Sequence, residues 1–170
     1  MFPEMKRKRQ LLSENESVEI LKRGTSGVLA LSDPDNQNYP YAVPLSYVYS
    51  DGRIIFHCAL RGYKTDIINK NPKASFCVVD ADDVHGEQLT TYFRSVIVFG
   101  TVRIVTDESE KIKLLEILGE KYQKDIGKDP EELRQKREEE IRKALGRTAV
   151  LVLDAEHMTG KQAKELVSAE

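Results

Sequence analysis

Short runs of apolar and β-branched residues recur along the chain, and their spacing predicts strands. Between residues 41 and 49 apolar and small or polar positions alternate, which places the odd-numbered side chains on one face. Asp51-Gly52 separates this run from the next one and predicts a hairpin, because glycine readily adopts a positive φ. The longest run, residues 89–105, contains Gly100 and predicts one bent strand or two strands sharing a kink. The predicted strands are 28–31, 41–49, 54–57, 74–79, 89–105 and 148–153.

Capping residues predict two helices in the first half of the chain. Ser13 and Glu16 have the spacing of a capping box, in which each side chain bonds the other residue's backbone N–H. The helix that follows is expected to end at Gly24 with a positive φ. A second, shorter helix is predicted over 63–69 and is closed by Asn71-Pro72.

Two further helices are predicted between the long strand and the last one. Thr106-Asp107 opens the first, whose apolar stripe consists of Ile112, Leu115, Leu118 and Tyr122. Asp129-Pro130 opens the second, with an N-cap aspartate and a proline in the first turn. The second helix has a thin apolar stripe, so we expect it on the outside of the molecule.

The order of these elements favours an α+β fold, predominantly β, with an antiparallel barrel-like sheet and flanking helices. A length of 170 residues is typical of a single domain. We therefore expect one domain over 1–170, with a basic N-terminal tail (1–12) and a helical insert at about 106–146. The basic run at residues 6–9 is expected to be a solvated, frayed end.

Composition excludes several classes of protein. The 26 Lys and Arg and 28 Asp and Glu give a net charge of −2, which disfavours general nucleic-acid binding. No apolar stretch is long enough to span a bilayer, and the N-terminus lacks the apolar core of a secretory signal. Cys58 and Cys77 form no CxxC pair, which argues against a zinc site and fits a reducing cytoplasm.

Most familiar motifs are absent from the sequence. Gly160-Lys161 resembles the end of a P-loop but lacks its first glycine and its Ser or Thr. No GxG occurs, so there is no Rossmann fingerprint. His57, His85 and His157 lie in separate segments without metal-ligand spacing, so no metal site is expected. His57 and Cys58 are adjacent in a predicted strand, where they point to opposite faces and cannot form a catalytic pair.

Three segments carry features that packing alone does not require. Pro44 lies within a strand run, which is tolerated only at an edge, an end or a bulge. Gly62 precedes a short helix with Lys64 in its first turn, and a helix N-terminus with a lysine favours a phosphate. Arg94-Ser95 puts a cation and a hydroxyl inside an apolar strand. Taken singly, His57 also fits a satisfied core histidine, Lys64 a surface lysine and Ser95 a residue that merely fills a strand position.

Together these segments resemble the FMN-binding split β-barrel family of pyridoxamine 5′-phosphate oxidase-like proteins, and within it the nitroimidazole-resistance (Nim-type) branch. The matching pieces are YAVPLSY (41–47), IFHCALRGYKTDIINKNP (55–72), YFRSVIVFG (92–100) and TGK (159–161). The resemblance implies an antiparallel split β-barrel and a homodimer that holds FMN at the subunit interface. It implies cofactor contacts from Val43, Pro44, Leu45, Ser46, His57, Cys58, Ala59, Lys64, Arg94, Ser95, Val96 and Lys161.

The sequence departs from this family in two places. Tyr63-Lys64 stands where many oxidases have Arg-Lys for the phosphate, so one cation is missing. The Arg-, His- and Trp-rich C-terminal segment of true pyridoxamine phosphate oxidases is absent from residues 160–170, which argues against vitamin B6 oxidation.

Three functions remain open. The resemblance implies an FMN-dependent oxidoreductase that reduces a small planar acceptor such as a nitroaromatic, with His57 as the catalytic residue. The first alternative is a non-catalytic flavin- or haem-binding or sensing protein on the same fold. The second is an interaction protein that has kept the barrel and lost the cofactor.

Overall fold

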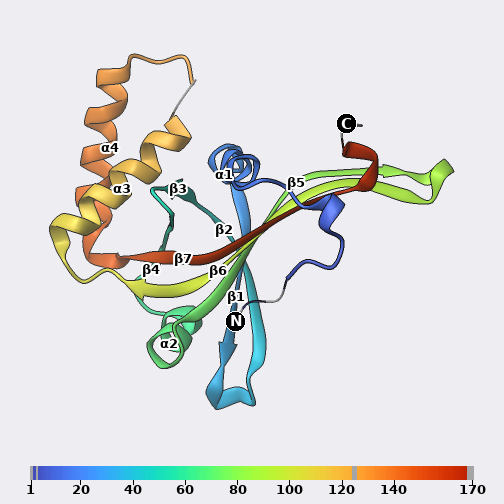
Figure 1. Ribbon diagram of the computed structural model, residues 1–170. Coiled ribbons are helices and arrows are strands. Elements are labelled where there is room, and N and C mark those ends of the chain that lie inside the picture. Colours follow the sequence, from blue (N-terminus) through green and yellow to red (C-terminus); the bar gives the residue numbers. More distant parts are fainter. Residues whose placement is uncertain (1, 3, 124–125, 168–170) are drawn as a thin grey trace.

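The computed structural model describes residues 2, 4–123 and 126–167. These residues form four α-helices and one antiparallel seven-stranded sheet in the order β2-β1-β5-β6-β7-β4-β3 (Figure 1), which confirms the predicted α+β split barrel. The strands are β1 (Ser26–Asp33), β2 (Tyr39–Ser46), β3 (Val48–Ser50), β4 (Arg53–Ala59), β5 (Lys73–His85), β6 (Thr90–Ile104) and β7 (Thr148–Gln162). The helices are α1 (Glu14–Arg23), α2 (Tyr63–Lys70), α3 (Glu108–Gln123) and α4 (Pro130–Ala144). No helix in the described part of the chain is long and apolar enough to cross a membrane.

The barrel is split between β2 and β4. β2 pairs only with β1, and residues 57–59 of β4 pair only with β7, within the described ranges. The sheet curls so that β2 approaches β4, and both strands keep an unpaired edge. Pro40 and Pro44 lie on β2. Proline has no backbone N–H to donate, which is tolerated on an edge strand. Of the three positions that the sequence left open for Pro44, an edge, an end or a bulge, the structure shows the edge.

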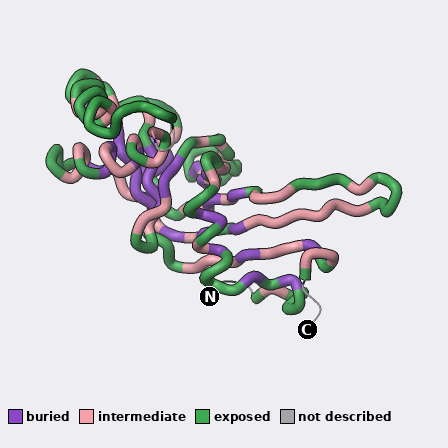
Figure 2. The backbone as a smooth tube through the Cα atoms, turned by 90° about the horizontal axis from the view of Figure 1, so that it is seen from above, coloured by how far each residue is buried: buried purple, intermediate pink, exposed green. Residues whose placement is uncertain are grey.

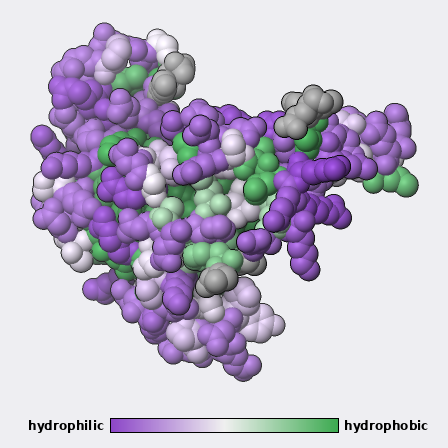
Figure 3. Space-filling model, in the orientation of Figure 1, coloured by the Kyte–Doolittle hydropathy of each residue, from purple (hydrophilic) through white to green (hydrophobic). Residues whose placement is uncertain are grey.

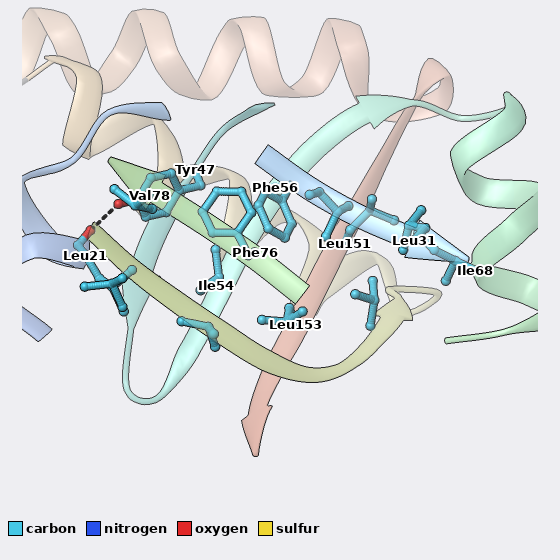
Figure 4. Packing of buried hydrophobic residues seen from close by; sticks show 14 of the residues in the cluster. Leu21, Leu31, Tyr47, Ile54, Phe56, Ile68, Phe76, Val78, Leu151 and Leu153 are labelled. Carbon is cyan, nitrogen blue, oxygen red and sulfur yellow. Dashed lines mark hydrogen bonds between the residues drawn. The ribbon is translucent and has the colours of Figure 1, made fainter. Parts of the chain in front are cut away.

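The core fills the inside of this curled sheet (Figure 4). Phe76 lies at its centre, with ring centroids 4.9 Å from Tyr47 and 5.0 Å from Phe56 in edge-on contacts. Tyr47 is fully buried and its hydroxyl donates to the carbonyl of Leu21, 2.8 Å away. A second apolar cluster lies between the outer face of the sheet and α3 and α4; it includes Ile55, Leu115, Ile141, Val150 and Val152.

The predicted strand over 41–49 is broken at Tyr47. The Tyr122 hydroxyl on α3 accepts from the Tyr47 N–H at 2.9 Å and bonds its carbonyl at 2.8 Å, replacing strand pairing at that residue. The break separates β2 from β3 but leaves the predicted face intact, because Tyr41, Val43, Leu45 and Tyr49 all pack on the core. Tyr122 was expected only in an apolar stripe, and its polar end instead joins α3 to the sheet.

β5 and β7 extend well beyond their predicted ends, whereas β6 (Thr90–Ile104) fits the predicted strand 89–105. β5 and β7 run past the predicted ends at residues 79 and 153, and the β5–β6 hairpin continues as a long arm to a turn at Gly86–Gln88 (Figures 1 and 2). The β5 half of the arm, residues 80–85, is exposed or half-buried, so it leaves no hydrophobic pattern in the sequence. β6 is a single strand with a register shift between Phe99 and Gly100. Of the two predicted alternatives, one bent strand is therefore correct.

The helix ends follow the predicted capping residues with one exception. Ser13 and Glu16 form both hydrogen bonds of the capping box, and Asp129 accepts from two backbone N–H groups at the start of α4. Gly24 closes α1, but its φ is −62°, so the predicted positive φ is wrong. The glycine is needed there because a Cβ would lie 2.6 Å from the Tyr47 hydroxyl. Only Ile141 of α4 is buried, which agrees with an outer helix.

The N-terminal tail is more ordered than its charge suggests. Residues 6–9 are exposed as expected, but Gln10 and Leu12 are buried against the barrel. Leu11 forms a β-bridge with Lys161, and the Leu12 N–H donates to the Gly160 carbonyl at 3.1 Å. The end of the tail thus lies along the outer edge of β7.

Candidate functional site

The first group of predicted site residues lies at the split between β2 and β4. Pro44 and Ser46 are exposed on β2, while Val43 and Leu45 point toward the core. On β4, His57 and Ala59 are exposed and Cys58 packs on the core, so His57 and Cys58 face opposite sides as expected. The structure therefore places residues 43–46 and 57–59 on two facing, unpaired strand edges.

Lys64 lies beside this split, in the first turn of α2. The helix is anchored by Ile67 and Ile68, which are buried in the core. Its N-cap is Gly62, which offers no side-chain cap, and the first backbone N–H that bonds within the helix is that of Asp66. Lys64 is half-buried, and among the described residues no carboxylate lies within 4 Å of its Nζ. Free N–H groups and an uncommitted lysine together make an anion site.

Cys58 lies close enough to Lys64 for the two groups to interact electrostatically. Burial is the larger effect and raises the pKa of the Cys58 thiol, while the Lys64 charge opposes that rise. The thiol therefore stays protonated at neutral pH, which does not favour a nucleophilic role.

Tyr63 occupies the position where the family resemblance led us to expect a second cation. Its hydroxyl donates to Asp33 Oδ2 at 2.6 Å, and its ring lies edge-on to Tyr41 with centroids 5.0 Å apart. This hydrogen bond holds the pKa of Asp33 below its usual value and raises that of Tyr63. Tyr63 thus fixes the start of α2 to the β1–β2 hairpin. Sequence reasoning identified the missing cation but not the Asp33 contact, which joins positions 30 residues apart.

The second group of predicted residues lies on the distal part of β6 and β7. Ser95 pairs with Lys161 across the two strands, and the Lys161 ammonium lies 5.3 Å from the centre of the Phe93 ring. Val96 is fully buried, so its side chain belongs to the core, and its backbone lies between its strand partners Val78 and Gly160. Arg94 is already committed to Asp80, with 3.4 Å between its Nη1 and a carboxylate oxygen.

Asp80 was missed in the sequence and ties α1 to the β5–β6 arm. Both its oxygens accept hydrogen bonds from Arg23, at 2.7 and 2.6 Å, and Arg94 lies on the same carboxylate. The side chain of Asp80 is only 11% exposed. The Arg23 hydrogen bonds hold the pKa of Asp80 below its usual value, although burial opposes them.

Replacing Asp80 with asparagine should lower the free energy of unfolding at pH 7 by about 1.5–3 kcal/mol, the range for hydrogen bonds to charged groups. Because the folded-state pKa is depressed, this stabilisation is present above the unfolded pKa of about 3.9 and is lost as pH falls through the folded value. Urea unfolding should therefore show a smaller difference in unfolding free energy between wild type and Asp80→Asn at pH 2–3 than at pH 7. Asp82→Asn, on the exposed part of the same arm, is the control. If Asp80→Asn lost the same unfolding free energy at both pH values, the charge of Asp80 would not be the source of the stabilisation.

The two groups do not meet within one chain. Val150, which pairs with His57, and Lys161 are eleven positions apart on β7. That separation is about 35 Å along the strand at roughly 3.3 Å per residue. β1 and β5 also lie between β2 and β6. A ligand the size of a nucleotide could therefore contact both groups only if they came from different subunits. No cluster of three or more His, Cys, Asp or Glu with metal-binding geometry occurs in the part of the chain that the structure describes.

The fold and this site define a split β-barrel protein with an uncapped helix N-terminus, carrying Lys64, beside an open strand edge. The sequence matches the pyridoxamine 5′-phosphate oxidase family over residues 13–162, so the chain belongs to this family. Comparison with the curated proteins found no match.

Several solved structures share the fold. A conserved hypothetical protein from Mycobacterium tuberculosis is 19% identical, with a TM-score of 0.74 and coverage of 98% of this chain and 96% of that one. A candidate 5-nitroimidazole antibiotic resistance protein from Bacteroides thetaiotaomicron is 18% identical, with a TM-score of 0.68 and coverage of 89% and 86%. An FAD and heme binding protein from Mycobacterium smegmatis is 16% identical, with a TM-score of 0.71 and coverage of 95% and 77%.

Proposed function

We propose that this protein binds FMN and acts as an oxidoreductase on a small planar acceptor such as a nitroaromatic. The observation that carries the proposal is the position of Lys64 in an uncapped helix N-terminus beside the split. FMN ends in one phosphate, which one lysine and one helix N-terminus suit. The open edges of residues 43–46 and 57–59 offer backbone donors and acceptors to a flat, polar-edged ring.

The bound flavin would supply the electron transfer, and the protein would supply orientation and polar groups. His57 is an exposed imidazole on the β4 edge, from which it would hold or deliver a proton at the reacting end of the site. Membership in the oxidase family supports the flavin, and the similarity in fold to a candidate nitroimidazole resistance protein supports the acceptor class. The free thiols of Cys58 and Cys77 fit a cytoplasmic location.

We further propose a homodimer with the cofactor at the interface. The outer face of the sheet carries a cross-strand row of apolar and small residues: Pro44, Val28, Cys77, Ile97 and Thr159. Val28 and Ile97 are 40% and 38% exposed, and Figure 3 shows apolar surface across the middle of the molecule. A second copy on this face would bring its Ser95 and Lys161 to the β2–β4 split, completing a site that is divided in one chain.

Light scattering coupled to size exclusion should give the mass of a dimer, and Ile97→Lys should raise the dimer dissociation constant at least tenfold. The lysine would place a charge in the middle of the apolar row, where it would lose its water without a partner. Val84→Lys, on the exposed β5–β6 arm, is the matched control and should leave the mass unchanged. A monomeric wild-type protein at micromolar concentration would contradict the proposed dimer.

A second candidate is a flavin- or haem-binding protein without catalytic turnover. The fold it shares with the M. smegmatis protein that binds FAD and heme supports this candidate. Turnover of a nitroaromatic by the flavin-loaded protein with an added reductant separates it from the first proposal.

The absorption spectrum of the purified protein tests the cofactor directly. A yellow protein that releases FMN on heating supports the first proposal, and a Soret band supports haem. A colourless protein whose spectrum stays unchanged on mixing with FMN would overturn flavin binding. It would leave an interaction protein that has kept the barrel.

A further inference from the structure

A cavity unrelated to the β2–β4 split lies between α1, β3, α3 and α4. Its volume is about 970 Å³, near the upper end of the range of small-molecule sites. Neither His57, Lys64 nor Ser95 lines it. Its location puts the helical insert, which the flavin site does not use, over one end of the sheet (Figure 1).

The wall of this cavity is apolar on one side and basic on the other. Val48, Tyr49, Ile117 and Leu133 supply apolar surface from β3, α3 and α4. Among the described residues, the lining has five basic side chains and two acidic ones. The basic residues are Lys22, Lys121, Lys128, Arg134 and Arg137, and the acidic ones are Glu120 and Glu131.

Three of the five cations already have carboxylate partners. Arg134 pairs with Glu131 and Glu138, Arg137 with Glu116, and Lys22 with Glu19. Lys121 and Lys128 differ, because no carboxylate of the described residues lies within 4 Å of either ammonium. Lys121 and Lys128 are therefore the lining cations left without an ion pair to a described carboxylate.

Lys121 is the cation best placed to hold a ligand. Its ammonium donates one hydrogen bond, to the Gly24 carbonyl at the end of α1, and lies 4.3 Å from the centre of the Tyr47 ring. An ammonium has three donors, so two remain for an acceptor in the cavity. Burial lowers the pKa of Lys121 to about 8, because the charged form loses hydration. A bound anion would offset that loss.

We propose that this cavity binds a small amphipathic carboxylate, whose carboxylate pairs with Lys121 and whose apolar body lies on Ile117, Leu133 and β3. A single negative charge matches one half-buried ammonium with two free donors. The apolar wall accounts for the rest of the ligand, since burying it there removes apolar surface from water. This site is separate from the proposed flavin site and can be tested whether or not flavin binds.

Isothermal titration of the full-length protein with octanoate tests the proposal. We expect octanoate to bind wild-type protein and 1-octanol to bind at least tenfold more weakly, because octanol lacks the charge. Lys121→Gln should lower octanoate affinity at least tenfold. Lys143→Gln removes an exposed lysine of α4 outside the cavity and should leave the affinity unchanged. Equal octanoate affinity in wild type and Lys121→Gln, or no binding by wild type, would overturn the proposal.

Chemical-shift mapping keeps the test independent of whether the variant folds. Octanoate added to wild-type protein should shift amide resonances of residues 117–123 and 130–137. Shifts confined to other parts of the chain would overturn the proposed location. FMN added to the same sample should leave octanoate binding unchanged, because the two sites share no residue.

Discussion

Replacing Lys64 with methionine should weaken FMN binding about tenfold to a hundredfold. A hydrogen bond to a charged group contributes about 1.5–3 kcal/mol, and 1.4 kcal/mol corresponds to a factor of ten. Tyr63, the neighbour that replaces a second cation, is bound to Asp33 and offers no positive charge to compensate. Quenching of FMN fluorescence on titration with protein gives the dissociation constants. The methionine keeps the length and apolar stem of the lysine.

The control for this experiment is Lys70→Met, at the opposite end of the same helix. Lys70 pairs with Asp35 on the β1–β2 connection and lies outside the proposed phosphate site. If α2 were merely loosened by loss of a lysine, both variants would bind FMN more weakly. Equal affinities of Lys64→Met and wild type, or an equal loss in Lys70→Met, would contradict a phosphate role for Lys64.

The fold could be predicted wherever burial leaves a pattern in the sequence. The alternation over 41–49 gave the correct inward face, and Asp51-Gly52 forms the predicted β3–β4 hairpin with φ of 51° and 76°. The β5 half of the arm could not be predicted from hydrophobicity, because residues 80–85 are exposed or half-buried, whereas its β6 half falls within the predicted strand 89–105. The break at Tyr47 depends on Tyr122, 75 residues later, and no local signal marks it.

The candidate site was predictable in its local parts and not in its partnerships. Gly62 and Lys64 mark a helix start with a lysine, so the anion site proposed there can be predicted from local sequence. Arg94 looked equally available in the sequence, but Asp80, on the neighbouring strand, holds it. The division of the site into two distant groups appears only from the strand order, in which β6 and β2 are separated by β5 and β1.

Replacing Phe76 with alanine should lower the free energy of unfolding by about 3–5 kcal/mol, the usual range for a buried phenylalanine. Phe76 is fully buried, and its ring contacts both Tyr47 and Phe56 edge-on. Gly27 approaches the same ring so closely that a Cβ there would lie 2.5 Å from it, so the surrounding backbone is shaped to this side chain. Denaturant unfolding followed by circular dichroism measures the change.

Val79→Ala, three positions further along β5, is the matched control. Val79 is 61% exposed, so its truncation should cost less than about 1 kcal/mol. The contrast tests where the barrel derives its stability, because β5 carries both residues but only Phe76 reaches the interior. If the two variants lost similar stability, the strand pairing of β5 and not the aromatic cluster would hold the sheet closed. Backbone pairing between the strands would then be enough to set the distance between β2 and β4 at the split.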